Sequence, residues 1–273
     1  MKKPNFFKRY GSYEGLLRSP YDARDYKYKD LVPLGAVAIP DRYETALAPW
    51  VYNQGTSSMC AACAYNYLRY LQESDEYTGS GLDAPLSPAF TYANRLDGED
   101  FEGMYLRSVC KKGREGSVPY TAFPGFFSYR KCKAKFRVLK DDLLKMAHPF
   151  RITSFYQCTS REEVQTAIIK NKAAITGVML HNCFYKPDWQ GHINYDPKVD
   201  TKANGGHAIL LVGWKTDESG MLWWKILNSW GKDYGINGTA WIPETYAWTE
   251  APWAIVDEVF ETEWKKYKED HNI

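Results

Sequence analysis

The chain of 273 residues lacks several features that would assign it to a special class of protein. No apolar run is long enough to span a membrane, and the basic first residues are not followed by the apolar stretch of a signal peptide. The net charge at pH 7 is only +2, and no internal repeat or low-complexity segment is visible. We therefore expect a cytoplasmic protein without a nucleic-acid or membrane partner.

Cysteine is also too sparse for a disulfide scaffold, with six residues in 273. Cys60 and Cys63 are close together, but two residues three apart on a helix are badly placed for a disulfide. No second pair with a matching spacing exists, so a zinc site is not expected. We expect six free thiols, as in a reducing compartment, and no bound metal.

Residues 52–63 (YNQGTSSMCAAC) begin as a polar loop and end as a helix. The apolar residues that follow are spaced by 3, 4 and 3, which predicts a helix over 59–72 with Ser57 or Ser58 as its N-cap. Cys60 would then lie in the first turn, where the helix dipole favours an anion and lowers a thiol pKa. A buried cysteine is more often simply a small apolar residue, so this stretch needs support from elsewhere.

Two later stretches supply that support. Residues 205–214 (GGHAILLVGW) place His207 at the start of an apolar strand, and residues 223–231 (WWKILNSWG) place Asn228 where a strand ends. A cysteine with a distant histidine and asparagine is a candidate set of nucleophile, base and orienting group.

The order and spacing of these motifs resemble those of the papain-like cysteine peptidases. Gln54-Gly55 is followed six residues after the glutamine by Cys60, then by Gly206-His207-Ala208 and by Asn228-Ser229-Trp230-Gly231. The resemblance implies that His207 takes the Cys60 proton and that Asn228 orients the imidazole. The Gln54 amide and the Cys60 backbone N–H would hold the oxyanion.

The resemblance also implies a substrate site lined by Gly103, Gly206 and Trp230, with Trp230 shielding the contact between histidine and asparagine. The chain departs from the family at three positions. Ser57 replaces the usual disulfide cysteine, Met59 a small residue, and Ala61 the usual tryptophan. The changes at 59 and 61 alter packing around the sulfur, whereas the reactive set is complete.

Helices before strands predict an α+β protein, and the resemblance implies a papain-like fold with its cleft between a helical lobe and an antiparallel β lobe. We expect an arm over 1–38 and a catalytic domain over 39–273, mainly helical in 39–145 and mainly β in 146–273. The loop 183–203 should wall the cleft. The expected helices are 59–72, 86–94, 104–112 and 160–171, with a short helix or loop at 141–146; the expected strands are 173–180, 207–214, 222–227, 239–242 and 254–260.

The arm is richer in aromatic residues than a disordered tail should be. We therefore expect it to pack against the body and bury its rings, either as a strap distant from the site or as a gate over Cys60. Its aromatic residues are Phe6, Phe7, Tyr10, Tyr13, Tyr21, Tyr26 and Tyr28.

Together these features predict a thiol peptidase that hydrolyses peptide bonds in a peptide or protein through an acyl-enzyme, with neither a metal nor an organic cofactor. A catalytically silent module that holds a peptide in the same cleft is the alternative from another class. A transpeptidase or deamidase that uses the same acyl-enzyme is the alternative among enzymes. The intact set of Gln54, Cys60, His207 and Asn228 favours an enzyme, while the side-chain preference and the oligomeric state stay open.

Overall fold

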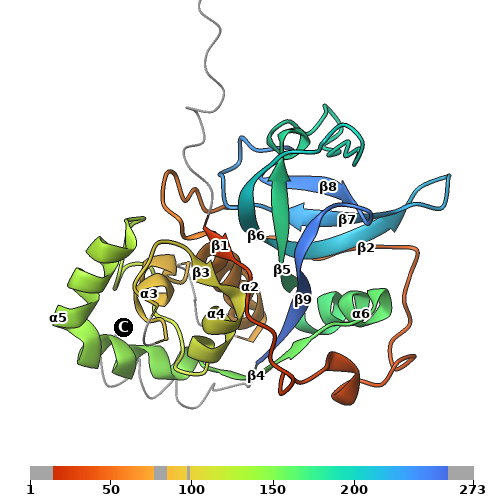
Figure 1. Ribbon diagram of the computed structural model, residues 1–273. Helices are drawn as coiled ribbons and strands as arrows, with labels where there is room; N and C mark the ends of the chain where they lie inside the picture. The colour runs from red at the N-terminus through yellow and green to blue at the C-terminus, as the bar shows by residue number, and fades with distance from the viewer. Residues whose placement is uncertain (1–14, 77–84, 97–98, 258–273) are drawn as a thin grey trace, which may run out of the picture.

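The computed structural model describes residues 15–76, 85–96 and 99–257. The helices are α2 (Cys60–Glu76), α3 (Pro88–Ala93), α4 (Leu106–Gly113), α5 (Tyr129–Ala147) and α6 (Arg161–Asn171), with short 3₁₀ turns at Tyr28–Asp30, His148–Phe150 and Asn182–Tyr185. Helices α2 to α5 gather on one side of the molecule and an open sheet lies on the other, with α6 packed against the sheet and the arm from residue 15 onward passing between the two sides (Figure 1). This arrangement is the α+β architecture expected from the sequence.

Helix α2 is the centre of the helical lobe. Its predicted apolar positions, Ala61, Ala64, Leu68 and Leu71, are all buried. The opposite side is covered as well, since α3, α4 and the sheet all contact this helix. A helix enclosed on nearly every side has apolar residues around its whole circumference, and its polar side chains are paired within the protein, so it lacks the single apolar stripe of a surface helix. The buried Arg69 illustrates this, because its guanidinium forms ion pairs within the protein.

One sheet makes up the β lobe and continues across the cleft. Its main path runs β3-β1-β6-β5-β9-β4; β2 and β7 also pair with β6, and β8 pairs with β7. Every pair is antiparallel except β1 with β3. The strands are β1 (Leu16–Leu17), β2 (Arg42–Glu44), β3 (Met104–Tyr105), β4 (Ile152–Gln157), β5 (Ala174–His181), β6 (Ala203–Thr216), β7 (Leu222–Leu227), β8 (Thr239–Pro243) and β9 (Trp248–Asp257).

The sequence predictions for α3 and α6 are confirmed at their N-termini. Ser87 caps α3 by accepting a hydrogen bond from the Phe90 N–H, and Pro88 occupies the first position. Ser160 caps α6 by accepting from the Glu163 N–H.

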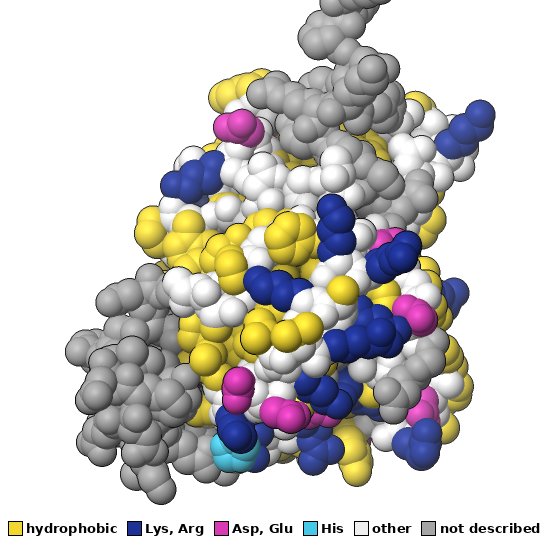
Figure 2. All heavy atoms as spheres, turned by 90° about the vertical axis from the view of Figure 1, so that its left-hand side faces the viewer, with side chains coloured by type: hydrophobic (Ala, Val, Ile, Leu, Met, Phe, Trp, Pro, Cys, Tyr) yellow, Lys and Arg dark blue, Asp and Glu magenta, His cyan; other side chains and the backbone are white. Residues whose placement is uncertain are grey.

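Helix α5 was not foreseen as one element. The sequence predicted only a short helix or loop at 141–146, whereas the structure has 19 helical residues there. The buried positions are spaced by 3, 4, 7 and 4, which is a helical spacing, but the many charged residues between them hide it in the sequence. Lysine and arginine side chains spread over the face on this side of the molecule (Figure 2). The buried residues of α5 are Tyr129, Cys132, Phe136, Leu143 and Ala147.

Three smaller predictions were wrong. Neither Ser57 nor Ser58 is the N-cap of α2, because the helix begins at Cys60 and the Ser57 hydroxyl donates to the Gln54 carbonyl at 2.7 Å. Helix α4 begins at Leu106 rather than at 104, because Met104 and Tyr105 pair with the arm. Strand β4 was missed, and β9 begins at Trp248 instead of 254; residues 258–260 lie outside the described residues.

Candidate active site

Cys60 is the first residue of α2 and is fully buried. Burial raises the pKa of its thiol to about 11, because the charged form loses its hydration. Backbone N–H groups from Ala208, Ala61, Cys60 itself and Gly15 act in the opposite direction and favour the thiolate. The sequence analysis predicted a thiol pKa lowered by the helix start and gave burial as the alternative; with the arm in place the prediction of a lowered pKa is wrong, because burial has the larger effect.

His207 lies on β6 and Asn228 directly follows β7, its neighbour in the sheet. The His207 Nε2 and the Asn228 Oδ1 are 2.7 Å apart, and both side chains are buried. Since the amide oxygen also accepts the Ser229 N–H at 2.8 Å, it is the acceptor and Nε2 is the donor. A neutral imidazole in this tautomer keeps Nδ1 free of a proton, so Nδ1 is the nitrogen that can act as base.

Aromatic rings cover this pair. The Trp230 ring lies 4.9 Å from the His207 ring, centroid to centroid. Phe184 meets the same imidazole edge-on at 5.9 Å, and Tyr185 stacks on Trp230 at 5.5 Å. Phe184 and Tyr185 come from the segment that precedes β6, so the expectation that this loop walls the cleft agrees with the geometry.

Gln54 is buried beside the loop that follows β7 and holds Asn228 and Ser229. Its backbone N–H donates to the Ser229 carbonyl at 2.9 Å, and its side-chain oxygen accepts from the Ser229 hydroxyl. The Nε2 group donates to the Ser57 carbonyl at 2.7 Å, which uses one of its two protons. The strand-like pairing of Asn53 with Trp230 completes the contact between the two loops.

The N-terminal arm lies directly against the sulfur. A Cβ placed on Gly15 would be 2.6 Å from the Ser58 carbonyl oxygen and 3.0 Å from the Cys60 Sγ, so only glycine fits there. From this point the arm continues as β1, with Leu16 opposite Gly206 on β6. The expectation of a strap distant from the site is therefore wrong for residues 15–17, which lie in the position expected of a gate.

The burial of the arm's rings is only partly as expected. Tyr28 is 1% exposed, whereas Tyr21 and Tyr26 are 89% and 71% exposed. The remaining rings, Phe6, Phe7, Tyr10 and Tyr13, lie outside the described residues.

Leu16 occupies a space that two glycines create. A Cβ on Gly177 would lie 2.2 Å from the Leu16 Cδ2, and a Cβ on Gly206 would lie 2.6 Å from the Leu16 carbonyl oxygen. The side chain and the backbone of Leu16 are thus held by residues without side chains of their own. Gly206 was foreseen as part of this surface; Gly177 and Leu16 carry no sequence motif and could not have been found without the fold.

Gly103 is adjacent to the arm, but its own polar groups are already used. Its N–H donates to the Tyr92 hydroxyl and its carbonyl accepts from Arg95, both at 2.8 Å. The N–H that pairs with the arm is that of Met104, which donates to the Gly15 carbonyl at 2.8 Å. The edge that an extended chain can pair with is therefore one residue beyond the predicted glycine.

The six cysteines are all free, including Cys60 and Cys63. Within residues 15–76, 85–96 and 99–257, no group of three or more His, Cys, Asp or Glu side chains is placed to hold a metal ion. No helix in that part of the chain is both long and apolar enough to cross a bilayer.

Comparison with known proteins agrees with this geometry. The sequence model of the papain family of cysteine proteases matches residues 86–250, more than half of the chain. The chain therefore belongs to the papain family. The matched segment contains His207 and Asn228 but begins after Gln54 and Cys60, so those two rest on their motif and on the geometry above.

Curated relatives are similar over shorter stretches. Mouse (Mus musculus) procathepsin L is 29% identical over 145 residues, which cover 51% of this chain and 38% of that protein. Cathepsin B-like CP3 of Giardia intestinalis is 49% identical over 37 residues, 14% of this chain and 12% of that one. The chain thus matches well under half the length of either relative.

Solved structures match over a much larger part of the chain. Xylellain, a cysteine protease from Xylella fastidiosa, has a TM-score of 0.76 at 23% identity and covers 92% of this chain and 98% of its own. Procathepsin B S9 from Trypanosoma congolense has a TM-score of 0.65 at 17% identity, with 95% and 90% covered. At these identities the likeness shows the fold, which is papain-like.

Proposed function

We propose that the chain is a thiol peptidase that hydrolyses peptide bonds through an acyl-enzyme on Cys60. The observation that carries the proposal is the buried hydrogen bond of 2.7 Å between His207 and Asn228. It fixes the imidazole in the tautomer a base requires, next to the residue, Ala208, whose N–H points at the Cys60 sulfur.

In the first step His207 takes the Cys60 proton and the thiolate attacks the substrate carbonyl carbon. The C=O π electrons move to the oxygen, and the Cys60 backbone N–H with the free Gln54 amide proton stabilises that oxyanion. The tetrahedral intermediate then collapses, the C–N bond breaks, and His207 returns its proton to the leaving amine.

In the second step water replaces the amine. His207 removes a proton from the water as it attacks the thioester carbonyl, and collapse of the new intermediate breaks the C–S bond. The acid product leaves and His207 protonates the sulfur, which restores the starting state. Trp230 keeps bulk water from the His207–Asn228 hydrogen bond during both steps.

With Gly15 against the sulfur and Leu16–Leu17 paired with β3 and β6, the full chain should be a latent form. A substrate needs the pairing edges of Met104 and Gly206 that the arm now occupies. Turnover is expected once this segment has left the cleft, by cleavage or by displacement.

The test is to react the full chain, and a trimmed chain from which residues 1–17 have been removed, with a fluorogenic peptide and with a peptidyl epoxide. We expect the trimmed chain to hydrolyse the peptide faster, and mass mapping to find the epoxide on Cys60. A Cys60→Ala variant of both chains is the control for contaminating peptidase.

Two outcomes would favour the alternatives. A trimmed chain that binds a peptide copy of residues 13–25 but never cleaves any peptide would favour a silent binding module. Transfer of the acyl group to an added amine in preference to water would favour a transpeptidase. Labelling at Cys63 with none at Cys60 would overturn the assignment of the nucleophile.

A further inference from the structure

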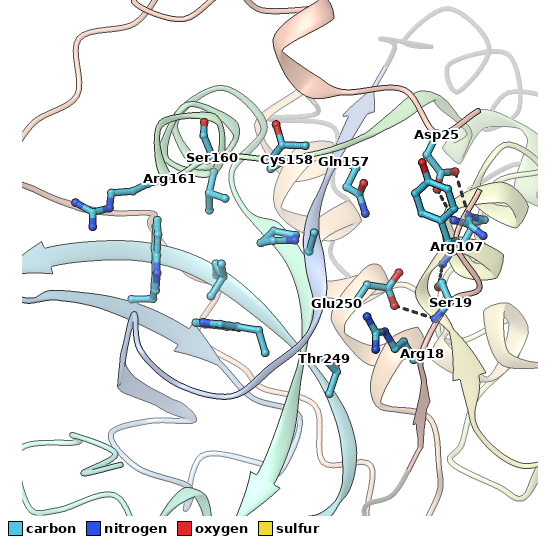
Figure 3. A pocket seen from close by; sticks show the side chains of 18 of the residues that line it. Arg18, Ser19, Asp25, Arg107, Gln157, Cys158, Ser160, Arg161, Thr249 and Glu250 are labelled. Carbon is cyan, nitrogen blue, oxygen red and sulfur yellow. Dashed lines mark hydrogen bonds and ion pairs between the residues drawn. The ribbon is translucent and has the colours of Figure 1, made fainter. Parts of the chain in front are cut away.

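A cavity of about 960 Å³ lies beside the cleft, between the arm and the β lobe (Figure 3). The arm forms one wall through Arg18, Ser19, Pro20 and Tyr21, and the far wall comes from β9 and the start of α6. Its volume is at the upper end of the range of small-molecule sites, roughly 300–1,000 Å³. No step of the proposed peptide hydrolysis uses this space.

Most of the charge around the cavity is already neutralised. Arg107 forms an ion pair with Asp25 through two hydrogen bonds, and Arg161 forms a similar pair with Glu244. These four side chains have no need of a ligand. The remaining two charged groups of the lining are Arg18 and Glu250.

Arg18 and Glu250 lie close together at the arm. Glu250 accepts hydrogen bonds from the Ser19 N–H at 3.3 Å and from the Trp253 indole at 2.9 Å. A carboxylate can accept about four hydrogen bonds, so Glu250 retains capacity for a donor. Arg18 is the residue before Ser19 and points its guanidinium toward the Glu250 carboxylate in Figure 3, with no ion pair or hydrogen bond to any residue the structure describes.

The floor of the cavity is apolar. Leu211, Val164 and Trp224 are each at most 5% exposed to solvent, and together with Trp248 they line the cavity. Trp248 and Glu250 are two residues apart on β9, a separation of roughly 7 Å along a strand. The cavity thus offers one cationic and one anionic group at one end and aromatic surface about 7 Å away.

We propose that this cavity binds a free α-amino acid with a large apolar side chain. The ammonium group would donate to Glu250, the carboxylate would accept from Arg18, and the side chain would lie against Trp224 and Trp248. A ligand with only a positive or only a negative group fits less well. With Arg107–Asp25 and Arg161–Glu244 already paired, the polar end of the cavity is left with one cation, Arg18, and one anion, Glu250. An amino acid is also the smallest product that peptide hydrolysis can release. The inference that such a product regulates the enzyme rests on the proposed function.

Binding there should hold the arm in place. Arg18 to Tyr21 form a wall only while the arm is docked, so a ligand that needs this wall binds the docked form and not the released one. By linkage, such a ligand multiplies the ratio of docked to released molecules by a factor of 1 + L/Kd, where L is its free concentration. The amino acid would therefore slow access to Cys60 from a site that does not touch the sulfur.

Calorimetry on the full chain with three probes tests the binding. The probes are L-tryptophan, L-tryptophanamide, which lacks the carboxylate, and N-acetyl-L-tryptophan, which lacks the ammonium. We expect L-tryptophan to bind and each of the other two to bind at least tenfold more weakly. Equal binding of all three, or of none, would overturn the proposal.

Two variants locate the site. Arg18→Gln should weaken L-tryptophan at least tenfold and abolish its preference over the amide. Arg24→Gln is the matched control, since Arg24 is an exposed arm residue that pairs with Asp22 and does not line the cavity. If the Arg24 variant loses binding and the Arg18 variant keeps it, the ligand binds elsewhere on the arm.

The coupling has its own measurement, which does not need peptidase activity. Saturating L-tryptophan should slow alkylation of Cys60 by iodoacetamide at least threefold in the full chain, and should have no effect on Arg18→Gln. Binding without protection of the thiol would overturn the coupling while leaving the site. A chain that binds tryptophan but hydrolyses nothing would contradict the proposed function and not this inference.

Discussion

The two halves of the candidate site differ in how ready they are. The half that holds His207, the proposed base, needs no residue of the arm, because His207 is hydrogen-bonded to Asn228 and covered by Trp230. The half that holds Cys60, the proposed nucleophile, is covered, because Gly15 lies against the sulfur and burial raises the pKa of the Cys60 thiol to about 11. On the proposed mechanism, access to the chemistry would therefore be controlled at the thiol, by release of the arm, and not at the base.

The largest expected effect separates the two neighbouring cysteines. Cys60→Ala should reduce hydrolysis by the trimmed chain by roughly 10⁶-fold, as other losses of a nucleophile do. Cys63 lies one turn further along α2 and is 1% exposed, so Cys63→Ala should cost only about 1 kcal/mol of unfolding free energy and leave kcat near its starting value. Initial rates and a denaturant titration of both variants give the comparison; a dead Cys63 variant with an active Cys60 variant would reverse the assignment.

The next effect concerns the loop that joins the halves. Gln54→Ala should lower kcat roughly 10²–10³-fold with little change in KM, because it removes an oxyanion donor. Ser229→Ala is the matched control, since it removes the Ser229 bond to the Gln54 oxygen but keeps the donor. Equal losses in the two variants, or a change confined to KM, would mean that Gln54 only packs the loop.

A smaller effect should follow from releasing the arm without cutting it. Arg107 on α4 pairs with Asp25 and also donates to the Pro20 carbonyl, so it ties the arm to the helical lobe. Truncating one member of a buried ion pair typically costs about 3–5 kcal/mol, and we expect somewhat less here because solvent reaches this pair. Arg107→Ala should accelerate iodoacetamide labelling of Cys60 by about tenfold or more in the full chain, the ratio that 1.4 kcal/mol produces.

Arg24→Ala is the control for that variant, because it breaks an exposed arm ion pair that does not reach the helical lobe. A labelling rate that rises equally in both variants would mean that any loss of arm charge opens the site, and Arg107 would have no special part in holding it.

The pH dependence of labelling sharpens the comparison further. Only the thiolate reacts, so the rate rises with pH through the thiol pKa. In the full chain that rise should be centred near 11, the pKa that burial imposes. In Arg107→Ala or the trimmed chain, renewed hydration removes the main cause of the raised pKa, and the midpoint should move to lower pH. An unchanged midpoint would show that the arm is not what buries the thiol.

The last prediction concerns the number of free thiols, for which we expect no difference from the number of cysteines. Six thiols should react with a chromogenic disulfide reagent after denaturation of the unreduced protein, since all six cysteines are free. Two or fewer would contradict both the structure and the sequence prediction of six free thiols.

Much of the architecture could be read from local signals. Ser87-Pro88 and Ser160 with Glu163 carry their helix starts in the sequence, and the strands around His207 and Asn228 are apolar runs of the right length. Helix α5 could not be read in this way, because lysines interrupt its apolar spacing. Strand β4 was equally hidden, since most of its residues are only half buried.

The site could be foreseen only where its residues belong to motifs. Gln54, Cys60, His207 and Asn228 are recognisable in order along the chain, and the structure brings the last two together and pairs the Gln54 loop with the Asn228 loop. Gly15, Leu16 and Gly177 are brought to the site by the close approach of segments more than 40 residues apart. Nothing in their local sequence distinguishes them from other small or apolar residues, and only the tertiary structure places them at the site.

Strand β1 has a consequence for how this molecule meets other chains. It is two residues long, yet it closes the gap between β3 and β6, so the sheet runs unbroken from one lobe to the other. When it leaves, two unpaired strand edges face each other, and an unpaired edge is a template for any extended chain. A substrate would then enter as a replacement strand, recognised first through its backbone. The same segment of a second molecule could enter too, so a concentrated solution of released protein should exchange arms and form dimers by swapping.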